Sequence, residues 1–150
     1  MDILHKVGIK SSSLDAVYHA LTTREGLSGW WTTDTRGDGE LGSVLHFTFK
    51  LKEGTGNIDM KVLELHPLER VVWEVVAGPE EWIGTKVSWD LRQEGEWIIV
   101  LFKHQGWKEA VEFMHHCSTK WAVFLLSLKA LLDTGKGSPN PDDFKLDSWE

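Results

Sequence analysis

Residues 108–135, KEAVEFMHHCSTKWAVFLLSLKALLDTG, carry the pattern that decides the fold. Apolar side chains recur there at intervals of three and four residues, the spacing of one face of an α-helix. Glycine at position 135 can adopt the left-handed conformation that commonly ends a helix. The pattern predicts one long amphipathic helix that begins after Trp107 and ends at Gly135. Its apolar stripe consists of Ala110, Phe113, Met114, Cys117, Trp121, Phe124, Leu125, Leu128, Leu131 and Leu132.

Upstream of this helix, the pattern of residues 32–104 predicts antiparallel strands separated by turns. Turn-forming residues occur at 37–39, 53–57, 67–69, 78–79 and 94–95. Alternate residues of the strand segments are apolar, so each strand places its bulk on one side. Apolar residues change face within 58–65, which predicts a β-bulge. The same-face sets are Leu45, Phe47, Phe49 and Leu51 in one strand and Val87, Trp89 and Leu91 in another.

The first 30 residues predict one strand and two short helices. Residues 2–10 alternate with period two, as in a half-buried strand. Ser12 and Asp15 have the spacing of a capping box, so a helix is expected from there to about Leu21. A second short helix is expected over 24–30. Together with the meander and the long helix, this order predicts an α+β fold in which a bent sheet wraps the last helix.

The composition fits one compact domain. With 150 residues, of which 41% are hydrophobic and 26% charged, the chain can bury about two-thirds of its surface without a disulfide or a structural metal. No repeat divides it, so we expect a single domain over 1–136 and an extended tail over 137–150, which contains two prolines. More than half of the aromatic residues are tryptophan, which favours aromatic-lined space as well as a packed core.

Charge and cysteine content restrict the partners and the compartment. The net charge of −7 leaves no cation surplus for a phosphate backbone, so nucleic acid is not expected as a partner. Cys117 is the only cysteine, which fits a reducing compartment. The first residues lack the apolar core of a signal peptide, and the apolar run 121–128 is too short for a membrane span. We therefore expect a cytoplasmic protein without a membrane span.

Four short motifs resemble a known family. Residues 17–23 (VYHALTT), 26–32 (GLSGWWT), 104–107 (HQGW) and 121–129 (WAVFLLSLK) resemble the START-like (SRPBCC) superfamily. Within it they are most similar to the branch related to the carboxy-terminal domain of the activator of the heat-shock-protein-90 ATPase. The resemblance implies a helix-grip fold, in which a curved antiparallel sheet and a long carboxy-terminal helix enclose an elongated cavity. Members of the superfamily bind lipids, sterols, polyketides or other apolar molecules, and some are cyclases or hydrolases.

The aromatic residues suggest the ligand-binding set. In the implied fold the pair Trp30-Trp31 meets the sheet, and several further aromatic side chains can face the same interior. An indole offers a large apolar face and one hydrogen-bond donor, which suits a small apolar ligand. The alternative is an ordinary packed core. The candidate ligand-binding residues are Trp30, Trp31, Phe47, Trp89, Phe102, His104 and Trp121.

His104 is the candidate for chemistry. It shares the inward face of its strand with apolar residues, and a buried imidazole can act as an acid, a base or a ligand anchor. The alternative is a core histidine whose hydrogen bonds are satisfied. If His104 is reactive, the protein is an enzyme of cyclase, dehydratase or hydrolase type acting on an apolar carbonyl or polyketide-like substrate. The leading hypothesis is a protein that binds a small apolar molecule in an aromatic-lined internal cavity, and the enzyme is the alternative.

No other catalytic, cofactor or metal motif is present in the sequence. It contains no nucleophile elbow and no phosphate-binding loop, and Cys117 lies on the apolar stripe of the long helix. Consecutive residues of a helix point about 100° apart, so His115, His116 and Cys117 cannot converge on one ion. We expect no cofactor and no metal site.

One strand has apolar residues on both faces. Trp97, Ile99 and Leu101 lie opposite Ile98, Val100 and Phe102, whereas the outer face of such a sheet normally faces water. Two covers are possible: a second copy of the chain, which makes a homodimer, or the carboxy-terminal tail. An exposed patch would also suit a protein-interaction module that modulates a chaperone ATPase, which is the third functional hypothesis.

Overall fold

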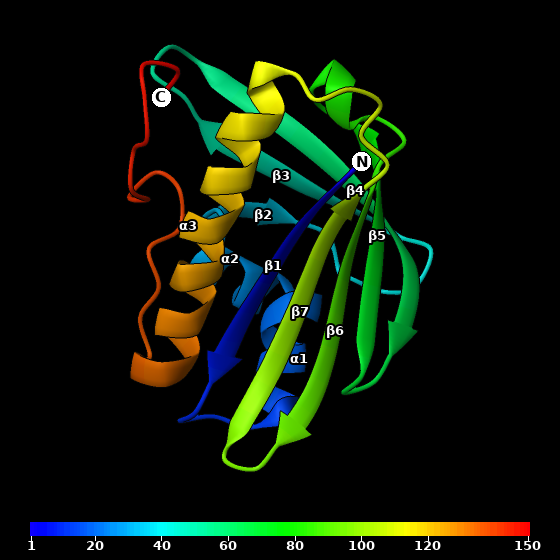
Figure 1. The fold of residues 1–150 in the computed structure, drawn as a ribbon, viewed down its shortest axis with the longest axis vertical. Helices are drawn as coiled ribbons and strands as arrows, with labels where there is room; N and C mark the ends of the chain where they lie inside the picture. Colours follow the sequence, from blue (N-terminus) through cyan, green and yellow to red (C-terminus); the bar gives the residue numbers. More distant parts are fainter.

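Seven antiparallel strands form one curved sheet, and a long helix packs against one face of it (Figure 1). The computed structural model covers residues 1–150. The strand order is β1-β7-β6-β5-β4-β3-β2, so the first strand pairs with the last. The strands are β1 Asp2–Ile9, β2 Asp34–Arg36, β3 Val44–Lys50, β4 Thr55–His66, β5 Arg70–Ala77, β6 Lys86–Glu94 and β7 Trp97–Gln105. The helices are α1 Leu14–Thr22, α2 Arg24–Trp30, the short 3₁₀ turn η1 Glu80–Trp82, and α3 Glu112–Thr134.

This architecture confirms the α+β helix-grip prediction, with small differences at helix ends. Gly135 ends α3 with a φ of 90°, as predicted for a left-handed cap. The helix begins at Glu112, somewhat later than the apolar stripe suggests. At α1 the cap is Ser13, not Ser12, because the extended backbone of Ser13 lets its hydroxyl accept the amide hydrogen of Ala16 at 3.1 Å.

The expected irregularity in the fourth strand is present. The pairing of β4 with β5 shifts register between Asp59 and Met60 and again between Val62 and Glu64. The first shift leaves Val76 of β5 unpaired, and the second leaves Leu63 of β4 unpaired, so that each of these strands bends at its extra residue. The bend contributes to the curvature with which the sheet surrounds α3.

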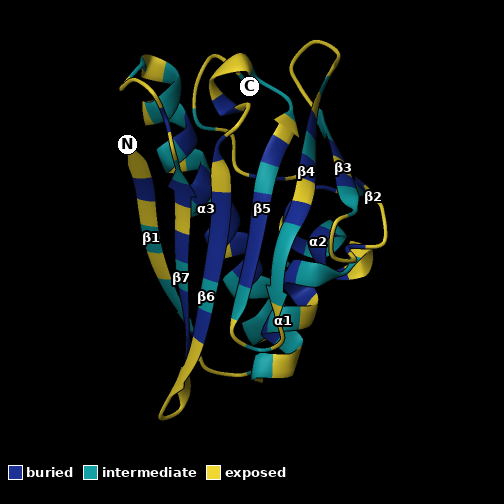
Figure 2. Ribbon diagram, turned by 90° about the vertical axis from the view of Figure 1, so that its right-hand side faces the viewer, coloured by how far each residue is buried: buried dark blue, intermediate teal, exposed yellow.

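The core between the sheet and the helices is rich in tryptophan. Figure 2 shows the buried residues along the inner strands and on the helices that face them. The rings are in close contact: the centroids of Trp31 and Phe47 are 4.3 Å apart, and those of Phe102 and Trp121 are 4.6 Å apart. The largest fully buried side chains are Trp30, Trp31, Trp73, Trp89, Phe47 and Phe102.

The outer face of β7 is only partly exposed. Trp97 remains 42% exposed, but its ring lies over Gly8, where a Cβ atom would meet the ring at 2.9 Å. The ammonium groups of Lys10 and Lys129 lie 5.7 and 5.4 Å from the centroid of the ring. Ile99 is buried beside it. Because Gly8 has no side chain, the ring of Trp97 can lie against the backbone, and the two lysines cover part of the ring.

The carboxy-terminal tail does not cover that face, so this alternative is wrong. Figure 1 shows residues 137–150, in orange and red, running back along α3. The tail is anchored at Asn140, whose backbone N–H donates to the carbonyl of Trp31 at 2.8 Å and whose carbonyl accepts from Thr33 at 3.1 Å. These bonds place the tail beside β2 and β3, away from the outer face of β7.

The structure contains no helix with the length and apolar character required to cross a membrane.

Candidate functional site

A cavity of about 590 Å³ opens between α3, the β3–β4 hairpin, η1 and the tail. Its volume lies within the range of small-molecule sites, which is roughly 300–1,000 Å³. Aromatic rings supply much of the wall: Trp82 stacks on Trp121 with centroids 5.8 Å apart, and Trp31 lies 5.2 Å from Trp121. The hydrophobic lining residues are Trp31, Phe49, Leu51, Ile58, Trp82, Phe113, Cys117, Trp121, Phe124 and Trp149.

Two of the seven residues proposed from sequence, Trp31 and Trp121, line this cavity. The other five, Trp30, Phe47, Trp89, Phe102 and His104, lie deeper, in the packed core. Trp30 is an example: its indole N–H donates to the carbonyl of Ala20 at 2.8 Å, and its own carbonyl accepts from Ser127 at 2.8 Å. It therefore joins α2 to α1 and α3.

His104 is fully buried, and both of its ring nitrogens are hydrogen-bonded. Trp121 Nε1 donates to Nδ1 at 3.1 Å, so the ring hydrogen is on Nε2. Nε2 then donates to Thr85 Oγ1 at 2.8 Å, and that hydroxyl donates to the carbonyl of Trp82 at 2.5 Å. Burial lowers the pKa of His104 to about 3. The imidazole is neutral, and no nitrogen is free to exchange a proton with a ligand.

Cys117 lines the cavity but is not activated. Burial raises the pKa of its thiol to about 12, so the thiolate that would act as a nucleophile does not form near neutral pH. The side chain serves as a small apolar part of the wall, in agreement with its place on the stripe of α3.

The tail forms one wall of the cavity, and Asn140 fixes the start of that wall. The side chain of Asn140 accepts from the backbone N–H of Lys50 at 2.8 Å and donates to the carbonyl of Lys50 at 3.0 Å. Asn140 itself is buried, and these bonds are partly shielded from water. This pairing ties the start of the tail to the end of β3.

A network of charges holds the rest of the tail against α3. Lys120 Nζ donates to the carbonyl of Phe144 at 2.8 Å and contacts the carboxylates of Asp143, at 2.5 Å, and Glu150. Asp143 also pairs with Lys145 at 2.9 Å, and its side chain is only 1% exposed. Burial alone would raise the pKa of Asp143, but the hydrogen bonds from Lys120 and Lys145 outweigh it and hold the pKa below its usual value.

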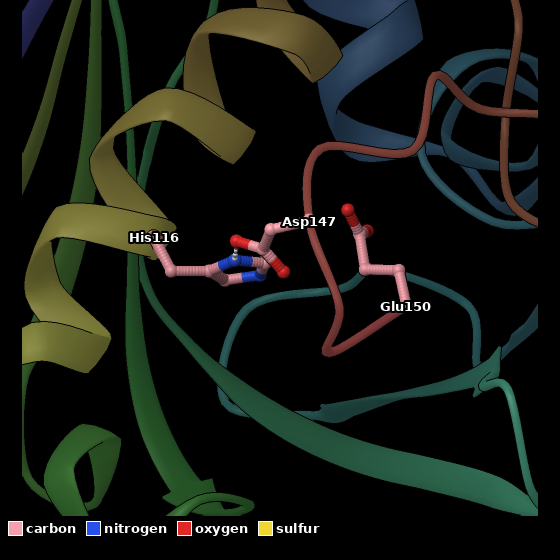
Figure 3. A group of neighbouring side chains, drawn as sticks. All are labelled: His116, Asp147 and Glu150. Carbon is pink, nitrogen blue, oxygen red and sulfur yellow. Dashed lines mark hydrogen bonds and ion pairs between the residues drawn. The ribbon is translucent and has the colours of Figure 1, made fainter.

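Figure 3 shows a second polar contact between α3 and the tail, made by His116, which lines the cavity, and Asp147. His116 Nδ1 and Asp147 Oδ2 are 2.7 Å apart, and the donor atoms of His116, Asp147 and Glu150 lie within 4.8 Å of one another. These are donor types that divalent cations use. Each already has a partner within the protein, since His116 bonds to Asp147 and Glu150 contacts Lys120. The bond from His116 lowers the pKa of Asp147.

Several lining residues were not proposed from the sequence. Phe49 was placed on the same face as Phe47, and Phe113 and Phe124 on the stripe of α3, so a signal existed for these three. Nothing in the local pattern marks Lys120 or the tail residues that meet it. They come together only because the tail folds back onto α3.

The comparisons with known proteins concern the fold and the family. A search of curated proteins returns no match. The chain is similar to the Aha1 dimer from Colwellia psychrerythraea, solved in solution, with 45% identity and a TM-score of 0.79 over 91% of this chain and 99% of that chain.

More distant structures share the fold alone. One is the protein SSP2350 from Staphylococcus saprophyticus, with 16% identity and a TM-score of 0.72 over 91% of this chain and 95% of that one. Another is CalU16 from Micromonospora echinospora, with 18% identity and a TM-score of 0.69 over 91% and 76% of the two chains. The family model described as "Activator of Hsp90 ATPase homolog 1-like protein" matches residues 11–133. The chain therefore belongs to this family, as its sequence motifs indicated.

Proposed function

We propose that the protein binds a small, mainly apolar molecule in the cavity beside α3. The observation that carries the proposal is the contrast between two neighbouring regions. The aromatic core is closely packed, whereas the adjoining space of about 590 Å³ is bordered by aromatic side chains and is not filled by them. An apolar molecule that enters this space removes its own surface and that of the rings from water.

Binding is better supported than catalysis. The enzyme hypothesis assigned His104 the role of acid or base, but both ring nitrogens are used within the core and the ring does not line the cavity. Cys117 lines the cavity as a neutral thiol. The geometry thus favours a binding protein over a cyclase, dehydratase or hydrolase.

The test is binding of the apolar fluorophore N-phenyl-1-naphthylamine, followed through its own emission and through tryptophan quenching. Ile58→Trp places a large ring in the cavity and is expected to abolish binding, since Ile58 is a buried part of the wall. Leu126→Trp is the matched control, because Leu126 is exposed and does not line the cavity. If the fluorophore fails to bind wild type, or binds both variants equally, the cavity is not the binding site.

We also propose that the protein forms a homodimer through the outer face of β7, around Trp97, Ile99 and Leu101. Two observations support this. The relative from Colwellia psychrerythraea is described as a dimer and shares 45% of its residues. Leu4, which is 62% exposed, lies on the neighbouring strand β1, so apolar surface continues beyond β7.

A further inference from the structure

Lys120 is the one cation that lies deep in the wall of the cavity. Its side chain is 12% exposed, and its ammonium is 5.3 Å from the centroid of the Phe124 ring. Removing an ammonium from water is costly unless an anion compensates it. An ammonium at the position of Lys120 therefore requires an anionic group beside it in the cavity wall.

The structure supplies that partner entirely from the tail. Lys120 contacts the carboxylates of Asp143 and Glu150 and the carbonyl of Phe144. These contacts bridge residues 23 to 30 positions apart in the chain. Since all three acceptors belong to one segment, movement of that segment would leave the ammonium available to another anion.

The two carboxylates are held differently. Asp143 is almost completely buried and is shared between Lys120 and Lys145. Glu150 has one further donor, the backbone N–H of Leu146, at 2.6 Å. Lys120, Lys145 and Asp143 together carry a charge of +1, and Glu150 brings the group to zero. Displacing Glu150 from Lys120 leaves Lys145 paired with Asp143, whereas displacing Asp143 would leave Lys145 without its carboxylate partner.

The remaining charges around the cavity favour an anion as well. Four lysines, Lys50, Lys52, Lys120 and Lys145, line it, against two carboxylates, Asp143 and Glu150. The excess among lysines and carboxylates is 4 − 2, or two positive charges, in a protein whose net charge is −7. The cavity therefore has the opposite sign to the molecule as a whole, which attracts anions to it.

We propose that the cavity takes an apolar molecule that carries one acidic group, a carboxylate or a sulfonate, and that Lys120 binds this group after it displaces the carboxylate of Glu150. The inference rests on the proposed function and specifies its ligand class. Glu150 then acts as an internal competitor: its carboxylate satisfies Lys120 in the free protein and leaves when an external anion arrives.

The test compares two fluorophores with the same aromatic skeleton. 8-Anilinonaphthalene-1-sulfonate carries an acidic group, and N-phenyl-1-naphthylamine does not. Glu150→Gln removes the competing charge and is expected to strengthen sulfonate binding about tenfold, in the range of one charge-assisted hydrogen bond, with no change for the neutral probe. Lys120→Met is expected to abolish the preference for the sulfonate.

Asp147→Asn is the matched control, because Asp147 holds the tail through His116 and not through Lys120. Equal effects of Glu150→Gln and Asp147→Asn would mean that Glu150 only fastens the tail, and the inference would be wrong. It is also wrong if Glu150→Gln leaves the ratio of the two affinities unchanged while both probes bind. If neither probe binds wild type, the proposed function itself fails. Because Asp143 remains as a carboxylate partner of Lys120, the Glu150→Gln variant is expected to keep the fold even where Lys120→Met does not.

Discussion

The indole N–H of Trp121 donates to Nδ1 of His104 at 3.1 Å, and this single bond fixes the tautomer of a fully buried imidazole. The opposite nitrogen then donates to Thr85, so the ring links α3 to the start of β6. The most conspicuous histidine of the sequence is thus a structural connection between the long helix and the sheet.

The first prediction concerns the pH dependence of stability. The pKa of His104 is lowered to about 3 in the folded protein, from an ordinary value of 6.5. Between these values the unfolded chain is protonated at His104 and the folded chain is not, so unfolding takes up a proton. One such group lowers the free energy of unfolding by about 1.4 kcal/mol for each pH unit below 6.5 and has no effect above it.

His104→Gln is expected to be less stable at pH 7 but to lose that part of the slope. Urea unfolding of both proteins between pH 7.5 and 5 measures the difference, because the other titrating groups are common to the two. Parallel stability curves would show that His104 does not titrate in this way.

The second prediction tests the register of α3. Trp121 is 2% exposed and contacts the core and the cavity, whereas Trp97 is 42% exposed. Trp121→Ala is expected to reduce the free energy of unfolding by about 3–5 kcal/mol, the usual cost of truncating a buried tryptophan. Trp97→Ala should cost clearly less. Equal urea midpoints for the two variants would contradict the burial of Trp121.

The third prediction concerns the anchor of the tail. Asn140→Ala removes two partly buried hydrogen bonds to the backbone of Lys50 and is expected to cost about 1–3 kcal/mol. It should also make residues 137–150 more sensitive to proteolysis while the sheet stays folded. Asn57→Ala is the control, because the side chain of Asn57 is bonded only at the exposed surface. Unchanged cleavage of the tail in Asn140→Ala would show that other contacts fix it.

The fourth prediction concerns self-association. Leu101→Lys introduces a charge on the outer face of β7, and in a two-fold dimer it does so on both subunits at once. Sedimentation equilibrium is expected to show a dimer for wild type and a shift toward monomer for this variant. Leu126→Lys, on an exposed part of α3, should behave as wild type. A monomeric wild type at high concentration would rule out the dimer.

The sequence was sufficient to predict the elements that depend on local pattern. Residues close together in the sequence determine the period of α3, its end at Gly135, the extent of α2 and the bulge in β4. Burial of the large aromatic residues also followed from their alternation. The family motifs supported the same architecture.

The sequence predicts an aromatic-lined cavity but does not predict where in the fold it lies. Apolar patterns show that Trp30, Trp89 and Phe102 face inward, but not whether their rings fill the interior, and here they do. The space that remains depends on where a tail far along the chain packs. Contacts such as that between Lys120 and Asp143 join distant positions through charge, for which hydrophobic periodicity gives no signal.

Because the tail forms one wall of the cavity, the residues that shape this wall differ from those that stabilise the fold. Residues of the aromatic core cannot change without loss of stability, whereas residues 141–150 mostly contact α3 and the cavity. Under the proposed function, a replacement in that segment is expected to alter which molecules bind while the sheet and helices keep their packing. Ligand selectivity and folding would then depend on different parts of the chain.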